Sequence, residues 1–443
     1  MKQAVILAGG RGTRLAKALG MDIPKPMAPV LGKPLLERTL ELLRDQGIRK
    51  IVLLVHHRAE VVEQAFGDGS RMGMEIRHVR EKEPRGTGGA LVDAREFLEK
   101  EFLVLYGDTL VEMDFSRMIR FHRERKAEVT LFVHPNDHPQ DSDLVELDGE
   151  GKVVALHPYP HPAGAEFPNL VNAALYAMER TALDGTWPAG GFDIAKDMVP
   201  AWLGQGRRIF GYRGDGYIKD MGTPERLAKV ERDVQNGTTR RKSGREPRMA
   251  VFLDRDGTLN VEKGHLRRAE DLELFPEVAG AVKRLNQAGV PAIVVTNQPV
   301  IARGEADFAD VEAIHRRLQR RLAEGGAFVD SIFLCPHHPD RGFPGERPEL
   351  KVACACRKPG TGMIEEAARR YHLDLKSSWM VGDSARDTEC ARRAGMRSVL
   401  VTRGGGGGPE ADYRMPDLAA AVERILEESG LSPVGARASL TAR

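Results

Sequence analysis

The segment FLDRDGTLN at residues 252–260 decides the fold of half of the chain. A run of apolar residues ends at Asp254, a second carboxylate follows at Asp256, and a glycine turn comes next. Two carboxylates packed this closely repel each other unless a cation lies beside them. Acids delivered at the carboxyl end of a buried strand are typical of the ligand sites of parallel α/β sheets. The segment therefore predicts a doubly wound α/β domain with a cation-binding site.

A second segment, LAGGRGTRL at residues 7–15, likewise follows an apolar strand. A chain of 443 residues is longer than one hydrophobic core usually supports, so we expect two domains. Strand and helix patterns alternate in the first half, which predicts another parallel α/β sheet. The expected elements are strands at 4–8, 50–55 and 102–108 and helices at 35–47 and 223–235.

The polar stretch 236–247 has no apolar periodicity and is expected to link a first domain, 1–235, to a second domain, 248–430. The elements expected in the second domain are strands at 249–254, 291–297, 331–335, 378–383 and 398–402 and helices at 277–289, 307–323 and 417–428. The glycine-rich stretch 403–417 is expected to be a flexible loop, and residues 431–443 a frayed tail.

Charge and composition exclude several classes of partner. Lys and Arg (66) nearly balance Asp and Glu (64), so a formal charge of +2 leaves no basic surplus for nucleic acid. The apolar start AVILA has about five residues before the glycines, too few for a signal peptide or a membrane span. We therefore expect a soluble cytoplasmic protein that acts on small molecules. The sequence leaves the oligomeric state open.

The loop at 7–15 has features that suit a nucleoside triphosphate. Gly9 and Gly10 let backbone N–H groups close around a phosphate, although glycine loops of this kind are often only tight turns. Lys25 stands between two prolines, a rigid mount for a cation. Asp108 ends an apolar strand and Asp220 precedes a turn, so together they could hold Mg²⁺. Singly, each acid is more often a helix cap, and the lysine is more often solvated.

This combination resembles the sugar-1-phosphate nucleotidylyltransferases over residues 1–235, and most of all the D-glycero-α-D-manno-heptose 1-phosphate guanylyltransferases. The resemblance implies that a sugar-phosphate oxygen attacks the α-phosphorus of the triphosphate and that pyrophosphate leaves. It also implies the roles of single residues. These are the triphosphate loop with Leu7, Gly9, Gly10 and Arg14, charge stabilisation by Lys25, Mg²⁺ ligation by Asp108 and Asp220, nucleobase contacts from Gly86 and Thr87, and a sugar contact from Asn172.

Two positions depart from the pattern of this family. Many relatives have glycine where this chain has Ala174, in the strand VNAALYAM. Relatives also carry a lysine for the sugar phosphate in a VEKP-like segment, and here the corresponding stretch reads ALHPYPHP. Lys219 of YIKD could take over that role, and an exposed lysine without a role is an equally good reading.

Three further groups follow the Asp254 loop at the ends of later strands or in loops. Thr296 with Asn297 offers a hydroxyl and an amide for phosphate oxygens, Lys358 a positive charge, and Asp383 a metal ligand with Asp387 behind it. The set resembles the haloacid-dehalogenase (HAD) phosphatases over about residues 248–425. The resemblance implies that Asp254 is the nucleophile and Asp256 the general acid and base. It assigns Mg²⁺ to Asp254, Asp383 and Asp256, the last through its backbone.

Three cysteines and a histidine form a C-x-H and a C-x-C motif separated by sixteen residues: Cys335, His337, Cys354 and Cys356. Three thiolates and one imidazole suit a tetrahedral structural Zn²⁺ site. Cys354 and Cys356 are poorly spaced for a disulfide with each other. His338 is the alternative ligand to His337, and Cys390 is expected in the core.

The cysteine motif resembles a subgroup of the HAD phosphatases that contains the D-glycero-D-manno-heptose 1,7-bisphosphate 7-phosphatases and the histidinol-phosphate phosphatases. In this subgroup the metal loop replaces the cap over the site. The segment TNQPVIARG strengthens the heptose likeness, with Arg303 and Arg357 as candidate substrate-binding residues. Relatives usually have Ser-Gly where this chain has Pro299 and Val300.

The two resemblances predict consecutive activities. A phosphatase that leaves heptose 1-phosphate makes the substrate of a guanylyltransferase, and GDP-heptose for surface glycans would be the product. The alternatives are another sugar or nucleotide, a phosphatase of the histidinol-phosphate type, or one silent domain that serves as a binding module. The nucleobase, the anomer and any direct transfer of the intermediate stay open.

Overall fold

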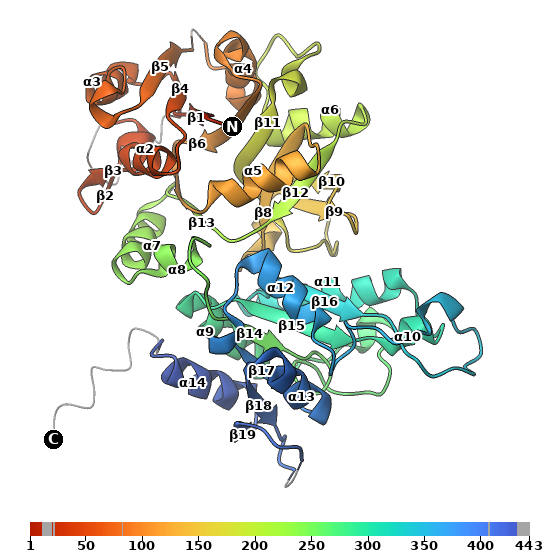
Figure 1. The fold of residues 1–443 in the computed structure, drawn as a ribbon. Coiled ribbons are helices and arrows are strands. Elements are labelled where there is room, and N and C mark those ends of the chain that lie inside the picture. Colours follow the sequence, from red (N-terminus) through yellow and green to blue (C-terminus); the bar gives the residue numbers. More distant parts are fainter. Residues whose placement is uncertain (11–19, 21–22, 82, 406–407, 432–443) are drawn as a thin grey trace, which may run out of the picture. The chain divides into compact units, whose positions relative to one another are not determined.

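The structure is a computed structural model that describes residues 1–10, 20, 23–81, 83–405 and 408–431. The chain divides into two compact units. Unit 1 comprises residues 1–134, 142–161 and 170–245, and unit 2 comprises residues 135–141, 162–169 and 246–443. Both units are mixed α/β, which confirms the expected fold class (Figure 1).

Unit 1 is built on a large mixed sheet in the order β10-β9-β11-β6-β1-β4-β5, with β8 beside β11 and β12 beside β8. The central strand β1 is parallel to both β4 and β6. The expectation of a parallel sheet is wrong for the other part of the sheet, where β11 is antiparallel to β6, β8 and β9. From β8 to β11 the strands follow one another without an intervening α-helix, so the strand–helix alternation that predicts parallel pairing ends there. The strands are β1 (Gln3–Leu7), β4 (Lys50–Val55), β5 (Glu75–Arg80), β6 (Glu101–Tyr106), β8 (Val129–His134), β9 (Leu144–Leu147), β10 (Val153–His157), β11 (Val171–Glu179) and β12 (Ile209–Arg213). A separate antiparallel pair joins β7 (Thr109–Glu112) to β13 (Tyr217–Asp220).

Helices pack on both faces of this sheet because β1 alternates its apolar side chains between them. Ala4 and Ile6 enter one buried cluster and Val5 enters another. The first cluster includes Leu36 and Leu40 of α2. The helices of unit 1 are α2 (Leu35–Asp45), α3 (Ala59–Phe66), α4 (Gly86–Asp93), α5 (Phe115–Glu124), α6 (Val199–Gly204), α7 (Pro224–Gln235) and α8 (Thr238–Lys242).

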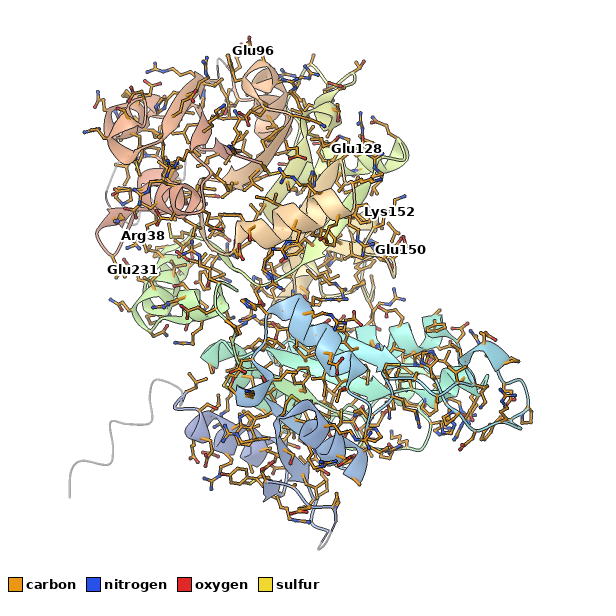
Figure 2. All side chains as sticks on the ribbon, in the orientation of Figure 1. Arg38, Glu96, Glu128, Glu150, Lys152 and Glu231 are labelled. Atoms are coloured by element: carbon orange, nitrogen blue, oxygen red, sulfur yellow. The ribbon has the colours of Figure 1, made fainter. Side chains whose placement is uncertain are left out.

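Several charged side chains of unit 1 lie on the outside, as Figure 2 shows for Glu96, Glu150 and Lys152, each of which is exposed. This distribution fits a sheet that is covered by helices and whose polar residues face water. Within the described residues, no helix is both long enough and apolar enough to cross a membrane.

The stretch expected as a linker, 236–247, is partly helical. Helix α8 follows α7 directly, and Thr238 and Thr239 are buried. Small hydroxyl side chains can be buried where a longer polar side chain could not, and a hydrophobic pattern does not report such a segment. The N–H of Asp114 donates to the carbonyl of Ser243 at 3.1 Å, which ties this stretch to unit 1 up to Arg245.

Unit 2 contains a six-stranded parallel sheet in the order β16-β15-β14-β17-β18-β19. Its strands are β14 (Val251–Leu253), β15 (Ala292–Asn297), β16 (Ser331–Cys335), β17 (Trp379–Gly382), β18 (Arg397–Val401) and β19 (Tyr413–Met415). Its helices are α9 (Val278–Ala288), α10 (Pro299–Ala302), α11 (Phe308–Glu324), α12 (Gly362–Tyr371), α13 (Ala385–Ala394) and α14 (Leu418–Glu428). Buried residues of α9, α11 and α14 form the core on one face, and those of α12 and α13 form the core on the other.

Strand β19 lies inside the stretch 403–417 that was expected to be a loop. It has three residues and pairs in parallel with β18 at the edge of the sheet. A strand this short, next to a run of glycines, has too few residues to show the alternation that predicts strands. The expected tail falls almost entirely outside the described residues.

Ala174 interrupts β11 at a bulge. Its φ is 55°, in the left-handed region, and the register of β11 against β8 shifts between Asn172 and Tyr176. A left-handed conformation costs an alanine about 1–2 kcal/mol, whereas glycine adopts it freely. The glycine of many relatives at this position therefore has a conformational reason, and this chain carries the strain instead.

Replacing Ala174 by glycine is expected to raise the free energy of unfolding of unit 1 by about 0.5–1 kcal/mol, because the strain outweighs the added entropy of the unfolded chain. Denaturant unfolding measures the change. The control Ala65→Gly, on the exposed side of helix α3, should lower the stability by about 0.5–1 kcal/mol. An Ala174→Gly protein that is destabilised as much as the control would contradict the strain.

Candidate functional site

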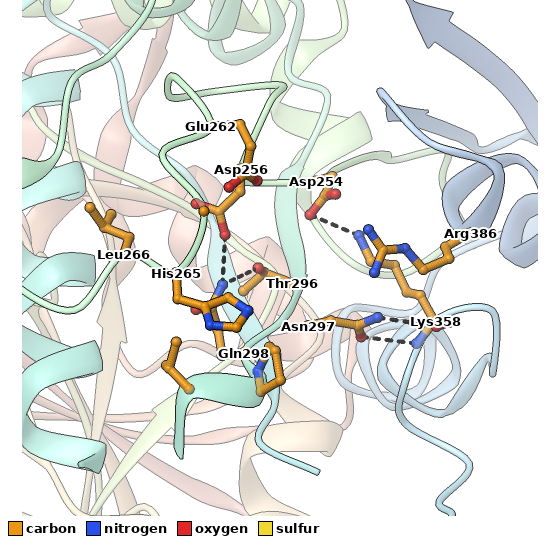
Figure 3. Close-up of a pocket in the computed structure, with 13 residues that line it drawn as sticks. Asp254, Asp256, Glu262, His265, Leu266, Thr296, Asn297, Gln298, Lys358 and Arg386 are labelled. Carbon is orange, nitrogen blue, oxygen red and sulfur yellow. Dashed lines mark hydrogen bonds and ion pairs between the residues drawn. The ribbon is translucent and has the colours of Figure 1, made fainter. Parts of the chain in front are cut away.

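The carboxyl ends of β14 and β15 form one wall of a pocket in unit 2, and the end of β17 lies at the same edge of the sheet. Asp254 follows β14, Thr296 and Asn297 end β15, and Asp383 follows β17. Because β14 lies between the other two strands and all three are parallel, these groups meet at one edge of the sheet. The pocket has a volume of about 270 Å³. Figure 3 shows the residues that line it, which include Asp254, Asp256, Glu262, His265, Thr296, Asn297, Gln298, Lys358 and Arg386.

Lys358 is buried at this edge between two carboxylates. Its Nζ lies 2.8 Å from Oδ1 of Asp254 and 2.7 Å from Oδ1 of Asp387. The side-chain amide of Asn297 holds the backbone of Lys358 in place, donating to its carbonyl at 3.1 Å and accepting from its N–H at 3.0 Å. The amide expected to bind phosphate thus also fixes the residue that supplies the positive charge.

Asp254, Asp383 and Asp387 form a cluster in which one carboxylate oxygen of each lies within 4.8 Å of the others. Burial raises the pKa of Asp254 against the lowering effect of the Lys358 ammonium, and burial with the charge of Asp387 raises the pKa of Asp383. One lysine does not neutralise three carboxylates. A cluster of hard oxygen donors that disfavour their own ionisation fits a divalent cation such as Mg²⁺.

Gly257 closes the loop against this cluster. Its φ is 78°, and a Cβ at this position would overlap the carboxylate of Asp383. Two independent reasons therefore require glycine at position 257: the left-handed backbone and the carboxylate of Asp383 beside it.

Asp256 stands apart from the three-carboxylate cluster. Its carboxylate accepts hydrogen bonds from Asn260 at 3.0 Å and Gln298 at 2.8 Å and pairs with Arg255. Burial by itself would raise the pKa of Asp256, but the Arg255 guanidinium and these hydrogen bonds lower it below its ordinary value. The third carboxylate of the cluster is that of Asp387, which the sequence placed only behind Asp383.

The predicted cysteine and histidine ligands come together at the end of β16. The Sγ atoms of Cys335, Cys354 and Cys356 and the Nδ1 of His337 lie within 4.8 Å of one another. The Sγ of Cys356 lies 3.2 Å from both other sulfurs and 3.3 Å from the imidazole nitrogen. A tetrahedral Zn²⁺ with Zn–S bonds of about 2.3 Å separates its sulfurs by about 3.8 Å. The three sulfurs lie 3.2–3.6 Å apart, so a small separation of the side chains would let the four atoms hold one ion.

The other candidates near this cluster have separate positions. His338 is buried, its Nδ1 accepts from the N–H of Asp340 at 3.2 Å, and it is not one of the four residues of the cluster. Cys390 is fully buried, as expected of a core residue. All four cysteines have free thiols.

The two arginines expected to bind substrate lie on different segments. Arg303 follows α10, and its Nη1 lies 2.9 Å from Nε2 of the pocket residue His265. The guanidinium of Arg303 also stacks 4.4 Å from the ring centre of Phe343. Arg357 donates to the carbonyl of His337 at 3.2 Å, and burial lowers its pKa. Arg303 is thus next to the pocket, and Arg357 is next to the cysteine cluster.

Three of the predicted transferase residues converge in unit 1. Lys25 forms an ion pair with Asp108, which follows β6. Asp220 ends β13 and accepts from Arg226 at 2.7 Å, and the nearby charge of Lys25 acts on it as well. Burial opposes the lowering of the pKa of Asp220 by Arg226. Three segments distant in sequence thus bring two carboxylates and a lysine together. The carboxylates can hold a metal and the lysine can hold a phosphate.

The glycine loop is described only up to Gly10, and the predicted residue Arg14 lies outside the described residues. Leu7 ends β1, and its carbonyl accepts from the N–H of Gly107 at 2.9 Å. A Cβ on Gly9 would approach Oε1 of Glu81 to 2.7 Å, so this carboxylate lies against the loop. This close approach explains on steric grounds why position 9 is glycine.

Gly86 and Thr87 begin helix α4 in contact with another segment. The φ of Gly86 is 71°, and a Cβ there would overlap the carbonyl of Phe192. The hydroxyl of Thr87 donates to Asp193 at 2.6 Å and accepts from the N–H of Ile194 at 3.0 Å. The contacts present at Thr87 are thus within the protein.

Asn172 lies in β11 ahead of the Ala174 bulge. Its side-chain amide donates to the hydroxyl of the buried Tyr176 at 3.0 Å. Burial raises the pKa of that phenol. Lys219, the possible substitute for the missing lysine, lies in β13 immediately before Asp220.

Sequence reasoning did not identify four residues that hold the sites together: Arg255, Asn260, Gln298 and Asp193. Arg255 gives no signal of its own in the sequence, because arginine side chains are mostly exposed in folded proteins. Gln298 directly follows Asn297, and its neutral amide carried no signal for chemistry. Asp193 is distant in sequence from its partner Thr87, so only the fold relates them.

Comparison with known proteins relates each half of the chain to a family. The family model described as nucleotidyl transferase matches residues 3–237, and one described as HAD-hydrolase-like matches residues 355–426. The chain is 34% identical over 237 residues to the mannose-1-phosphate guanylyltransferase of Mycobacterium tuberculosis. That match covers 53% of this chain and 65% of the mycobacterial enzyme, so the chain spans less than two thirds of that relative's length.

A second relative matches a different part of the chain. The chain is 44% identical over 191 residues to the D-glycero-D-manno-heptose-1,7-bisphosphate 7-phosphatase of Thermosynechococcus vestitus, covering 40% of this chain and 96% of that enzyme. Among solved structures, HddC from Yersinia pseudotuberculosis in complex with GMP-PN is 28% identical, with a TM-score of 0.45. That match covers 53% of this chain and 100% of HddC.

The buried ammonium of Lys358 is expected to stabilise unit 2. In metal-free buffer, Lys358→Met should lower the free energy of unfolding by about 3 kcal/mol, because Asp254 and Asp387 then lack a buried counter-charge. Thermal or denaturant unfolding of the full chain measures the loss. Adding Mg²⁺ should stabilise the variant more than the wild type, because the cation replaces part of the missing charge.

The matched control is Lys376→Met, which removes an exposed lysine of the same unit. It should change the stability by less than about 0.5 kcal/mol. Equal stabilities of the two variants would show that the Lys358 ion pairs contribute nothing.

Proposed function

The chain belongs to the nucleotidyl transferase family over residues 3–237 and its second half to the family of the heptose-1,7-bisphosphate 7-phosphatases, and on this premise we propose that it catalyses two consecutive reactions. Unit 2 removes the 7-phosphate of D-glycero-D-manno-heptose 1,7-bisphosphate. Unit 1 then transfers GMP from GTP to the resulting heptose 1-phosphate, giving GDP-heptose and pyrophosphate. The observation that carries the proposal is the union of both families in one chain, because the product of one chemistry is the substrate of the other.

The phosphatase reaction follows from the acids at the edge of the unit 2 sheet. A carboxylate oxygen of Asp254 attacks the 7-phosphorus while Asp256 gives a proton to the leaving sugar oxygen. Water then attacks the aspartyl-phosphate, and Asp256 takes up its proton, which regenerates Asp254 and releases phosphate. Lys358 holds Asp254 in place throughout, and its charge balances the phosphoryl group. Mg²⁺ held by Asp254, Asp383 and the backbone of Asp256, with Asp387 beside them, would neutralise the phosphate oxygens when bound.

The transferase reaction needs no covalent bond to the protein. The sugar 1-phosphate attacks the α-phosphorus of GTP in line with the departing pyrophosphate. Lys25 is paired with Asp108 in the structure. Once a cation occupies Asp108, Lys25 is free to stabilise the charge that develops on the phosphates. Mg²⁺ at Asp108 and Asp220 would supply that cation. Asn172 and Thr87 are the proposed contacts to sugar and nucleobase, and GTP as co-substrate makes the cytoplasm the proposed location.

The sugar is the least constrained part of the proposal. One relative of unit 1 acts on mannose 1-phosphate by its name, and the relative of unit 2 acts on heptose. The heptose assignment rests on the phosphatase, because both units of one pathway enzyme must share an intermediate. Pyrophosphate release measured with heptose 1-phosphate, mannose 1-phosphate and a panel of nucleoside triphosphates distinguishes the two sugars and the base.

Zinc is the proposed occupant of the Cys335, His337, Cys354 and Cys356 cluster. Purified protein should contain about one tightly bound Zn²⁺ per chain, since four such ligands complete a tetrahedron. Metal analysis checks this. Cys354→Ser should lose the ion, whereas Cys390→Ser, at a buried thiol outside the cluster, should keep it. Zinc-free wild-type protein, or full retention in Cys354→Ser, would falsify the assignment.

The two reactions should separate by mutation. Asp254→Asn is expected to block GDP-heptose formation from heptose 1,7-bisphosphate and GTP, because an amide cannot form the aspartyl-phosphate. Added heptose 1-phosphate should restore the product at the wild-type rate. Product analysis by mass spectrometry follows both substrates.

Asp108→Asn is the reciprocal variant. It should abolish nucleotidyl transfer from either heptose phosphate and leave phosphate release from the bisphosphate within about twofold of wild type. Consecutive action is refuted if the Asp254→Asn enzyme makes GDP-heptose from the bisphosphate at an undiminished rate. A single active unit is the conclusion if wild-type enzyme performs only one of the two steps.

A further inference from the structure

Arg255 is a buried cation between the two acids of the phosphatase site. It is 0% exposed and is among the largest fully buried side chains of the described residues. It does not line the pocket, although both of its sequence neighbours do. A guanidinium without access to the pocket cannot touch the substrate, so any effect on the reaction must pass through another residue.

The guanidinium of Arg255 binds Asp256 as a fork. Its Nε lies 3.1 Å from Oδ1 of Asp256, and its Nη2 lies 3.0 Å from Oδ1 and 2.8 Å from Oδ2. Paired N–H groups of this kind fix the plane of a carboxylate as well as its position. Asp256 therefore has little freedom to rotate about its own side-chain bonds.

On the side away from Asp256, the guanidinium of Arg255 contacts His315 of α11. The Nη1 of Arg255 lies 3.3 Å from Nε2 of His315, which is buried. Burial and the Arg255 charge lower the pKa of His315 to about 3, so the imidazole stays neutral and its Nε2 can accept from the guanidinium. The fork is thus anchored to the helix layer of unit 2.

The two oxygens of Asp256 have different neighbours on the other side. Oδ1 accepts from the side chain of Asn260 at 3.0 Å, and Oδ2 accepts from the side chain of Gln298 at 2.8 Å. Gln298 lines the pocket and also donates to the hydroxyl of Thr296 at 2.7 Å (Figure 3). Oδ1 therefore bonds to Asn260 in the loop, and Oδ2 lies on the pocket side beside Gln298. The amide of Gln298 can also donate to the hydroxyl of Thr296.

We propose that Arg255 is a positioning residue that fixes Asp256 so that Oδ2 is the oxygen that exchanges the proton with the substrate. This inference rests on the proposed phosphatase reaction. Because the Arg255 charge favours the ionised form of Asp256, Oδ2 first takes up a proton from solvent before the reaction begins. In the first step this proton leaves Oδ2 for the ester oxygen as the P–O bond breaks and the bond from Asp254 to phosphorus forms. In the second step Oδ2 takes a proton from the attacking water as the bond between phosphorus and Asp254 breaks. Gln298 keeps its hydrogen bond to Thr296 while Oδ2 carries the proton.

The test compares two phosphate esters that differ in their need for a proton. The leaving group of an alkyl phosphate is a strongly basic alkoxide, which needs a proton. The leaving group of p-nitrophenyl phosphate is a stable phenolate, which needs none. Because kcat/KM reports only the steps up to loss of the leaving group, it isolates proton donation from the later hydrolysis. Arg255→Met should lower kcat/KM about 100-fold for the alkyl ester and less than about 10-fold for the aryl ester.

Two further variants make the result specific. Arg255→Lys keeps the charge but not the fork, and should fall between wild type and Arg255→Met in the ratio of alkyl to aryl kcat/KM. In an Asp256→Asn background, either change at Arg255 should cost nothing further, because the residue acts through Asp256. Arg392→Met, at an exposed arginine of α13 that pairs with Glu389, is the matched control and should leave both rates unchanged.

Equal losses for the alkyl and aryl esters in Arg255→Lys and Arg255→Met would overturn the positioning role. So would additive losses in the Asp256→Asn background. If Arg255→Met does not fold, the Arg255→Lys series alone decides between these outcomes. A wild-type enzyme that hydrolyses neither ester would instead refute the proposed phosphatase reaction, which keeps the two failures distinct.

Discussion

The contact of one ammonium group with two carboxylates organises unit 2. Lys358 lies between Asp254, which follows the central strand β14, and Asp387, in the first turn of α13. A buried pair of acids without that cation would repel, which disfavours the approach of the two segments. Because Lys358 is two residues beyond Cys356, the same loop closes the cysteine cluster and delivers the charge. The pocket, the carboxylate cluster and the loop that carries the cysteine cluster therefore meet at one side chain and at the Asn297 amide that holds its backbone.

Much of the fold and of the phosphatase site was predictable because the informative residues are local in sequence. The buried strand that ends at Asp254 fixes the position of this acid. The spacing of the C-x-H and C-x-C motifs is enough to identify the four side chains that cluster. What escaped prediction depends on contacts between distant segments or on short elements. Helix α8 hides buried hydroxyl residues in a polar stretch, and β19 has only three residues. Arg255 looks like a surface residue in sequence, and only the fold places it against His315.

The transferase site was harder to specify from sequence, and the reason is geometric. Lys25, Asp108 and Asp220 come from three separate segments, so their chemistry emerges only where these segments meet. Thr87 was chosen for its motif, yet its hydroxyl is engaged by Asp193. Motifs fix which residues are available, whereas hydrogen bonds decide which of their atoms remain open to a ligand.

Two glycines border the carboxylate cluster, and they limit how unit 2 can vary. A side chain at Gly257 would overlap Asp383, and one at Gly382 would overlap Asp387, so every acid of the cluster except Asp254 has a glycine against it. In a saturation library of this chain, these two codons should tolerate no replacement while the exposed residues of α13 vary freely. Variation near the site is then open to the helices and loops that border the pocket rather than to these two glycines. New substrates would have to arise there, without any change in the acids themselves.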